Sequence, residues 1–497
     1  MATGGFVTVN RRRGKQSGKE ISNGGRANEK EKNANQSIRS AGRPSAEWDY
    51  RSFSIIVAKA DEKAIGEGLE KMISERRLVG SYNWDVDSWI PTIVVPGAPK
   101  VFYPWSGGLL EVRNQTMTID EESFRIPNYP MEPLFTAVRL CQPNFKLSDV
   151  DLVADLNCLK KLLRFVLRAA FTSELDEDGE DPALDVHRNL FAGSNKDCDF
   201  RIDAQVIGRT IVLMRRETEH RGRAMGFGVG YLDACTKPYD ADPSAAGPHK
   251  RVTYVKFGGL RLLLRHKILA TIYPESPKHN NPPGRPMASN GYGGGGDSGS
   301  SWPNSIGCSA VRHVRGGFLG DHEDLIQIEF ASLSKERHSP LVIDKWLDML
   351  FIGSDHLYLG EHVRGRFEQP TIRRRADALD LSGLKASDGR RVLVILEMVL
   401  ESLVRYGRRS CGAGGGRRGK GTVGGNGDGR RRETPAYEPV SFSIVSRDEC
   451  RKLALYKNGS SKRQETAVSA VDKRWETPPA CVSEAMMASL LADFDHI

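Results

Sequence analysis

The chain has 497 residues, enough for more than one domain, yet its hydrophobic content of 39% and mean hydropathy of −0.44 are low for that length. Residues 1–46 (ten Lys/Arg, three Glu) and 408–432 (eight Lys/Arg, one Asp) each contribute +7 to the formal charge of +9, which leaves about −5 elsewhere and no basic folded surface. The eight cysteines are scattered without a C-x-x-C pair, which disfavours a disulfide framework or a zinc module and favours reduced thiols.

Three segments have compositions that are typical of disorder. Residues 1–46 predict a disordered basic N-terminal tail, 277–304 a Pro/Gly/Asn/Ser-rich insertion within a domain, and 407–434 an Arg/Gly-rich linker. Each contains too few large apolar residues to offset an ordering cost of roughly 1–2 kcal/mol per residue. The basic segments could bind nucleic acid, or could be solvated linkers.

Between these segments, residues 47–406 alternate helix and strand patterns, which predicts a single domain. The predicted elements, in chain order, are an irregular apolar segment over 90–105, a strand and an amphipathic helix over 151–171 with Asp155 or Asn157 as N-cap, a hairpin over 200–217, two strands over 249–272 joined through Gly258-Gly259, a strand over 324–332, and a helix over 387–407. This mixture predicts an α/β (α+β) fold with a central mixed β-sheet flanked by helices. Residues 435–497 predict a weakly structured C-terminal segment.

The chain contains no pattern that predicts secretion or a membrane span. The polar, basic N-terminus has no apolar core after it, and the longest apolar stretch, at 392–404, is interrupted by Glu397 and Glu401. We therefore expect a cytoplasmic or nuclear protein without a membrane partner.

Several segments resemble a fungal, largely uncharacterised family that often carries the label geranylgeranyl pyrophosphate synthetase. They include "PTIVVPGAPKVFYPW", "DVDLVADLNCLKKLLRFV", "FRIDAQVIGRTIVLMRRE" and "HKRVTYVKFGGLRLLLRH". Prenyl-diphosphate chemistry needs paired Asp-rich motifs to hold magnesium. The acidic cluster at 173–185 is a single Gly- and Pro-broken segment, so the label is unsupported.

The motifs of this family resemble those of DXO-type decapping nucleases, which have a PD-(D/E)-x-K-like fold. In that pattern a Gly-aromatic segment ends in Glu, one strand presents Glu-x-Asp, a neighbouring strand presents Glu-x-Lys, and a Trp-x-x-Gln follows. Residues i and i+2 of a strand point to the same face, so two strands direct four groups to one place. Carboxylates there hold divalent ions that activate water for phosphodiester cleavage.

The first two motifs are altered in this chain. The resemblance places Leu232 at the first Glu, with Asp233 beside it. The Glu-x-Asp positions fall on Lys267 and Leu269, within a Leu-rich strand. A lysine at about 4 Å would oppose a divalent ion by about 4 kcal/mol per unit charge at an effective dielectric of about 20, and leucine supplies no ligand.

The later motifs are altered as well. The Glu-x-Lys positions fall on Gln327 and Glu329 or, with the strand shifted by two residues, on Glu329 and Ala331. Trp346 is retained, but Met349 stands at the Gln position. Leu232, Lys267, Leu269, Gln327 and Met349 are therefore degenerate motif positions, and we expect the metal site to be lost.

Other residues could take part in a residual site. Glu217, Asp233 and Glu329 are the residual catalytic candidates, and a rebuilt site could hold Mg or Mn; otherwise no cofactor or metal is expected. His249 or His266 could ligate a softer ion. The resemblance leaves Arg215, Arg265 and Trp346 as candidate substrate-binding residues. A structural ion pair between Lys267 and Glu329 would fill the old metal position.

Three functions follow from this pattern. The favoured hypothesis is a catalytically degenerate DXO-like protein, a pseudoenzyme that retains binding of RNA ends or of a protein partner. A second is an active metal-dependent phosphodiesterase, an RNA 5′-end hydrolase with relocated carboxylates. A third is a scaffold or interaction protein, with the Arg/Gly-rich tails and a C-terminal helix over "SEAMMASLLADF" as its functional parts. The sequence leaves the oligomeric state open.

Overall fold

The computed structural model describes a large part of the chain. The described residues are 46–49, 69–118, 121–171, 200–216, 223–239, 247–272, 311–316, 326–334, 341–412, 440–447, 452–458 and 481–494. The acidic cluster, the 277–304 insertion and almost all of the predicted N-terminal tail and Arg/Gly-rich linker lie outside them. The described residues belong to one compact unit, which spans 43–460 and 477–497.

The largest element of the fold is an 11-stranded sheet. In order across the sheet, its strands are β1 (Ala46–Asp49), β21 (Lys452–Asn458), β20 (Ser441–Arg447), β8 (Arg201–Ile207), β9 (Thr210–Arg216), β7 (Leu152–Asp155), β13 (Leu260–Ile268), β12 (His249–Phe257), β2 (Ile73–Trp84), β3 (Thr92–Val95) and β15 (Arg312–Arg315). The sheet is mixed, because β7 pairs in parallel with both β9 and β13 and most other pairs are antiparallel.

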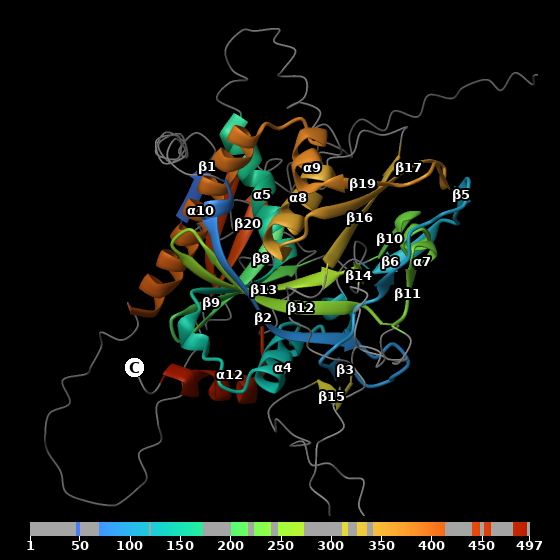
Figure 1. The fold of residues 1–497 in the computed structure, drawn as a ribbon. Coiled ribbons are helices and arrows are strands. Elements are labelled where there is room, and N and C mark those ends of the chain that lie inside the picture. The colour runs from blue at the N-terminus through green and yellow to red at the C-terminus, as the bar shows by residue number, and fades with distance from the viewer. Residues whose placement is uncertain are drawn as a thin grey trace, which may run out of the picture. The chain divides into compact units, whose positions relative to one another are not determined.

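Helices cover both faces of this sheet (Figure 1). On one side lie α5 (Leu156–Phe171), α8 (Leu341–Ile352), α9 (Arg375–Leu381) and α10 (Ala386–Gly412), and on the other lie α4 (Glu132–Cys141) and α12 (Glu484–Leu491). On β13, Leu262 and Leu264 pack in the first layer and Leu263 in the second. A strand buried on both faces is expected to have such a continuous apolar run.

A second, 8-stranded sheet continues from β13. Its strands, in order, are β11 (Thr236–Lys237), β4 (Val101–Phe102), β14 (Ala270–Ile272), β16 (Ile326–Ser334), β17 (His356–Val363), β18 (Arg366–Phe367) and β5 (Leu110–Glu111), with β19 (Thr371–Arg374) paired to β17. Only Leu269 separates β13 from β14, so the chain passes from one sheet to the other at this residue. This junction carries the altered Glu-x-Asp positions.

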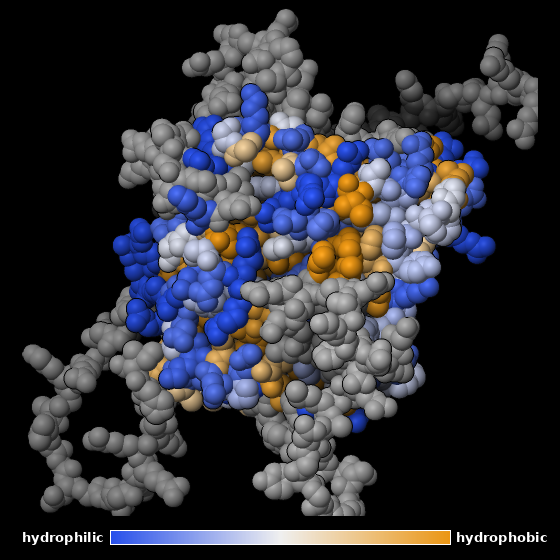
Figure 2. All heavy atoms as spheres, in the orientation of Figure 1, coloured by the Kyte–Doolittle hydropathy of each residue, from blue (hydrophilic) through white to orange (hydrophobic). Residues whose placement is uncertain are grey.

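The remaining elements are short. They are α3 (Glu121–Arg125), α7 (Gly228–Ala234), the two-stranded sheet of β6 (Gln115–Thr118) and β10 (Arg223–Gly226), and the 3-10 helices η1 (Leu69–Met72), η2 (Leu147–Asp149) and η7 (Ala492–Phe494). On the face shown in Figure 2, hydrophilic and hydrophobic side chains are interspersed. Among the helices described, none is both long and apolar enough to cross a membrane.

The α+β architecture with a central mixed sheet and flanking helices agrees with the prediction. The strand–helix unit at 152–171 and the hairpins β8–β9 and β12–β13 occur where expected. The boundaries of the last helix were wrong, because α10 continues past Gly407 to Gly412. The C-terminal segment also differs from the expectation, since β20 and β21 are integral strands of the large sheet.

Candidate functional site

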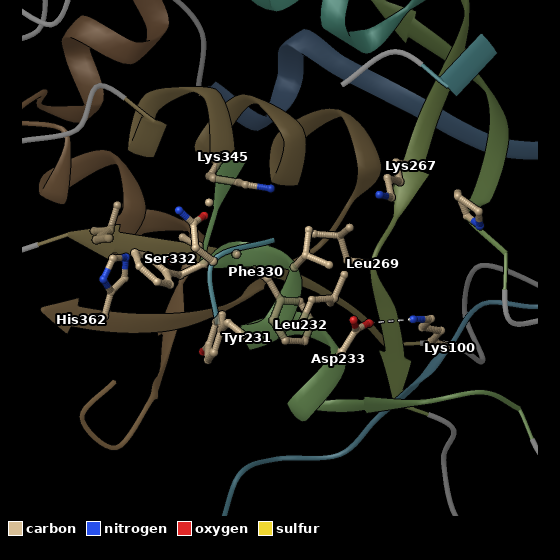
Figure 3. A pocket seen from close by; sticks show the side chains of 18 of the residues that line it. Lys100, Tyr231, Leu232, Asp233, Lys267, Leu269, Phe330, Ser332, Lys345 and His362 are labelled. Atoms are coloured by element: carbon tan, nitrogen blue, oxygen red, sulfur yellow. Dashed lines mark hydrogen bonds and ion pairs between the residues drawn. The ribbon is translucent and has the colours of Figure 1, made fainter. Parts of the chain in front are cut away.

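A cavity of about 1030 Å³ lies at the junction of the two sheets. Its walls come from α7, the end of β13, the start of α8 and the middle of β16, segments that are distant in sequence (Figure 3). Apolar side chains, including Phe227, Leu232, Leu269 and Phe330, form much of the lining. The cavity is large enough for a ligand the size of a nucleotide.

The structure brings several altered motif positions to this cavity. Leu232, Lys267 and Leu269 line it, as does Ala331. Gln327 and Glu329 are not among the lining residues. Met349, on α8, is fully buried in the core. The cavity wall therefore presents leucine, lysine and leucine at Leu232, Lys267 and Leu269.

Lys267 is an exposed residue in the lining of the cavity. Desolvation, followed by the charge of Lys250 directly opposite on β12, lowers the pKa of Lys267 to about 8. In the part of the chain that the structure describes, no hydrogen bond or ion pair involves its ammonium group. The charge of Glu121 partly opposes this pKa shift, but Glu121 makes no direct ion pair with Lys267.

The other lysines around the site each have a carboxylate. The ammonium of Lys100 lies 3.2 Å from Asp233, and that of Lys345 lies 2.8 Å from Glu329. Burial raises the pKa of Glu329, although Lys345 opposes that shift. The predicted pairing of Lys267 with Glu329 was therefore wrong. Lys345, from α8, is the ion-pair partner of Glu329 instead. The periodicity of a strand contains no information about where a helix packs on it.

His249 adds an unpaired acceptor to the wall of the cavity. The side-chain amide of Asn83 donates to the carbonyls of Ala98 and Gly247, so its oxygen accepts from His249 Nδ1 at 2.7 Å. Burial and then Arg251 hold the pKa of His249 well below its ordinary value, so the ring is neutral. Its Nε2 is a buried acceptor without a donor among the described residues.

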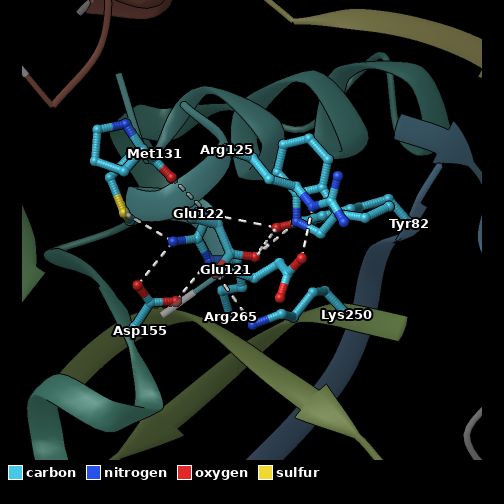
Figure 4. Close-up of polar contacts among 10 residues, drawn as sticks. Tyr82, Glu121, Glu122, Arg125, Met131, Asp155, Lys250 and Arg265 are labelled. Carbon is cyan, nitrogen blue, oxygen red and sulfur yellow. Dashed lines mark hydrogen bonds and ion pairs between the residues drawn. The ribbon is translucent and has the colours of Figure 1, made fainter. Parts of the chain in front are cut away.

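Arg265 lies in a buried polar network with Asp155, Tyr82 and Glu122 (Figure 4). Its guanidinium donates to Asp155 (Nη2 to Oδ2, 2.7 Å) and to the carbonyl of Pro130 (2.8 Å). Glu122 accepts from Tyr82 at 2.9 Å and from Lys250 at 3.1 Å. The network ties α3 and the start of α4 to β2, β12 and β13.

Arg265 and Trp346 are each 1% exposed, and neither lines the cavity. Arg265 is enclosed by its polar partners and Trp346 by the apolar core, so their expected role as substrate-binding residues stays a prediction. Arg215 is also buried, on β9.

The candidate carboxylates do not assemble into a metal site among the described residues. No three His, Cys, Asp or Glu side chains there are placed to hold a metal ion, and His249 and His266 do not form such a group. Asp233 and Glu329 are each engaged by a different lysine, and Glu217 lies outside the described residues. The ligand set that magnesium or manganese would require is therefore not present in these parts of the chain.

Comparison with known proteins gives a family match over part of the chain and similar folds over most of it. Residues 69–174 match a domain of unknown function (DUF8563). No curated protein matches.

The chain is similar to solved structures of Rai1 and Dxo1 proteins. The Rai1 structure from S. pombe has 10% sequence identity and a TM-score of 0.45, and the match covers 83% of this chain and 99% of that one. Candida albicans Rai1 in complex with pU5-Mn²⁺ has 8% identity and a TM-score of 0.44 (85% and 96% covered). K. lactis Dxo1 in complex with manganese has 7% identity and a TM-score of 0.43 (78% and 91% covered).

Proposed function

We propose that this chain is a catalytically degenerate, DXO-like protein whose cavity binds the 5′-phosphate of an RNA end without a divalent ion. The observation that carries the proposal is the ammonium of Lys267, which makes no ion pair within the described part of the chain, at a position where the resemblance implies a carboxylate in a DXO-like nuclease. A phosphate would supply a direct ionic partner.

The rest of the cavity fits such a ligand. The apolar walls around Phe227, Leu269 and Phe330 offer surface on which a base can pack. His249 Nε2 can accept a hydrogen bond from a ribose hydroxyl or an exocyclic amine that enters the cavity.

Catalysis by a metal ion is disfavoured by the same charges. Lys267 would repel a divalent ion, and Asp233 and Glu329 would first have to leave Lys100 and Lys345. The alternative of an active phosphodiesterase with relocated carboxylates requires Glu217 to join these two residues.

Binding of short 5′-monophosphate and 5′-hydroxyl oligoribonucleotides in EDTA tests the proposal. We expect the 5′-phosphate to improve affinity, and Lys267→Met to weaken binding of the phosphorylated oligonucleotide by about tenfold or more, the equivalent of one charge-assisted hydrogen bond. Lys256→Met is the matched control, because Lys256 lies on β12, is paired with Glu75 and does not line the cavity.

Two results would contradict the proposal. Equal affinity of wild type and Lys267→Met for the phosphorylated oligonucleotide would remove the binding role. Manganese-dependent hydrolysis of 5′-triphosphate or capped RNA that disappears in Glu329→Ala would show that catalysis persists.

A further inference from the structure

Lys267 is chemically distinct from the two other lysines that line the cavity. Lys100 and Lys345 each have a carboxylate within 3.2 Å of the ammonium group. Lys267 has no such partner in the described part of the chain, and it faces Lys250 across the β12–β13 ladder. An amine next to another cation and partly desolvated gives up its proton more easily than an ordinary lysine.

The surroundings of Lys267 also favour a covalent reaction. The cavity is open enough to admit a ligand, and Leu232 and Leu269 form apolar walls beside the amine (Figure 3). Because the pKa of Lys267 is lowered to about 8, a larger fraction of this amine is neutral than of an ordinary lysine at the same pH. Lysines of this kind, desolvated or beside a second cation, are the ones that form Schiff bases.

We propose that Lys267 is a nucleophilic lysine that condenses with an aldehyde bearing a phosphate group to form an imine. This inference rests on the proposed function in one respect, namely that the cavity attracts the phosphate group.

The neutral Nζ attacks the carbonyl carbon, and the π electrons move to the carbonyl oxygen. Proton transfer from nitrogen to oxygen gives a carbinolamine, which loses water to leave a C=N bond. The sum is one amine and one aldehyde giving one imine and one water, so no oxidant or reductant is required. The paired lysines, Lys100 and Lys345, lie in the lining of the same cavity and add amine donors for the phosphate.

Pyridoxal 5′-phosphate is a suitable probe, because it carries both the aldehyde and the phosphate. The full chain is incubated with it at pH 8, reduced with sodium borohydride and digested, and the labelled lysines are quantified by peptide mass spectrometry. We expect Lys267 to be labelled at least about tenfold faster than Lys256, because a larger fraction of its amine is neutral. Pyridoxal, which lacks the phosphate, should label Lys267 more slowly, and inorganic phosphate should compete.

Two readouts separate this inference from the proposed function: binding of the 5′-phosphate oligonucleotide by the wild-type chain, and the identity of the labelled peptide. Lys267→Arg should lose the dominant labelled peptide, because arginine forms no imine under these conditions. Lys256→Arg should change neither readout.

The wild-type chain alone can overturn the inference. Labelling spread evenly over exposed lysines, with no preference for Lys267, contradicts it whether or not any variant folds. Loss of phosphate binding with intact labelling at Lys267 would contradict the proposed function and leave the imine chemistry standing.

Discussion

Lys267 is disfavoured as a cation in the folded chain. Its pKa of about 8 lies below the ordinary value of 10.5, because desolvation and Lys250 oppose the charge. The unfolded chain therefore binds more protons than the folded chain between about pH 8 and 10.5, so the contribution of this residue to stability rises with pH in that window. Below about pH 8, both states are protonated and the fold carries the full penalty.

Replacing the amine should consequently stabilise the protein near neutral pH. We expect Lys267→Met to raise the Tm at pH 7, and the difference from wild type to shrink as the pH approaches 10.5. Thermal unfolding followed by circular dichroism across this range measures it. Lys256→Met, which removes a lysine already paired with Glu75, should give no such gain. A lower Tm for Lys267→Met at pH 7 would contradict the conclusion that the positive charge of Lys267 destabilises the folded chain.

The sequence anticipated part of this site. The strand period placed Lys267 and Leu269 on one face, and the structure has both at one cavity with Leu232. The partner of Glu329 was missed, because Lys345 reaches it from α8 and no local pattern encodes that docking. His249 was weighed as a metal ligand, whereas burial and then Arg251 lower its pKa. Its Nδ1 bonds to Asn83, and a single sequence does not place these groups beside it.

At the scale of elements, buried charge pairs connect α3 and α4 to the strands that bear the cavity. Burial alone would raise the pKa of Glu122, but Lys250, Arg265 and the hydrogen bond from Tyr82 together lower it below its ordinary value of 4.5. The contribution of Glu122 is therefore present above about pH 4.5 and is lost as the pH falls toward its depressed pKa. Lys250 also lies opposite Lys267, so this pair affects the charge at the cavity.

Neutralising either member of the buried Glu122–Lys250 pair should destabilise the fold. Glu122→Gln leaves Lys250 buried without its counter-charge, and we expect a loss of about 3–5 kcal/mol in the free energy of unfolding at pH 7. Denaturant titration measures the loss. The double variant Glu122→Gln/Lys250→Met should recover much of it, because no unpaired charge remains. A double variant as unstable as the single one would show that Glu122 acts through Tyr82 and Trp84 instead.

The β12–β13 hairpin sets the position of Lys267, and its turn requires glycine. Gly258 has a φ of +55°, and a Cβ at this position would overlap the carboxylate of Glu397. That carboxylate accepts a hydrogen bond from the backbone N–H of Gly259 at 2.8 Å. The Gly-Gly turn was predicted from the sequence, but its dependence on α10 was not.

Alanine substitutions distinguish the two glycines. Gly258→Ala combines a strained backbone with displacement of Glu397, so we expect a loss of more than about 1 kcal/mol in unfolding free energy. Gly259→Ala is the matched control, because its φ is not in the left-handed region and its nearest neighbour, Glu401 Oε1, lies 3.3 Å away and can move. Similar losses for both variants would argue against a specific requirement at Gly258.

For the whole molecule, distant parts of the chain complete one sheet. The strands β20 and β21 lie beside β8, and α12 covers the same sheet on the face that α4 occupies (Figure 1). Their short period-2 patterns, "SFSIVSR" and "KLALYKN", are separated by charged residues, and pairing with a strand more than 200 residues earlier has no local signature. For that reason the fold class could be predicted while the place of the C-terminal segment could not.

The buried side chain of Phe442 tests whether this C-terminal segment is part of the core. Phe442 on β20 is 0% exposed and packs edge-to-face on Tyr406 of α10, with ring centroids 5.1 Å apart. Phe442→Ala should therefore reduce the unfolding free energy by about 3–5 kcal/mol. Val445→Ala, half-buried on the same strand, is the control and should be far milder. If Phe442→Ala were as mild as Val445→Ala in denaturant titrations, the C-terminal strands would be a peripheral addition. A large loss confined to Phe442 would instead mean that the sheet behind the cavity depends on residues beyond the Arg/Gly-rich segment.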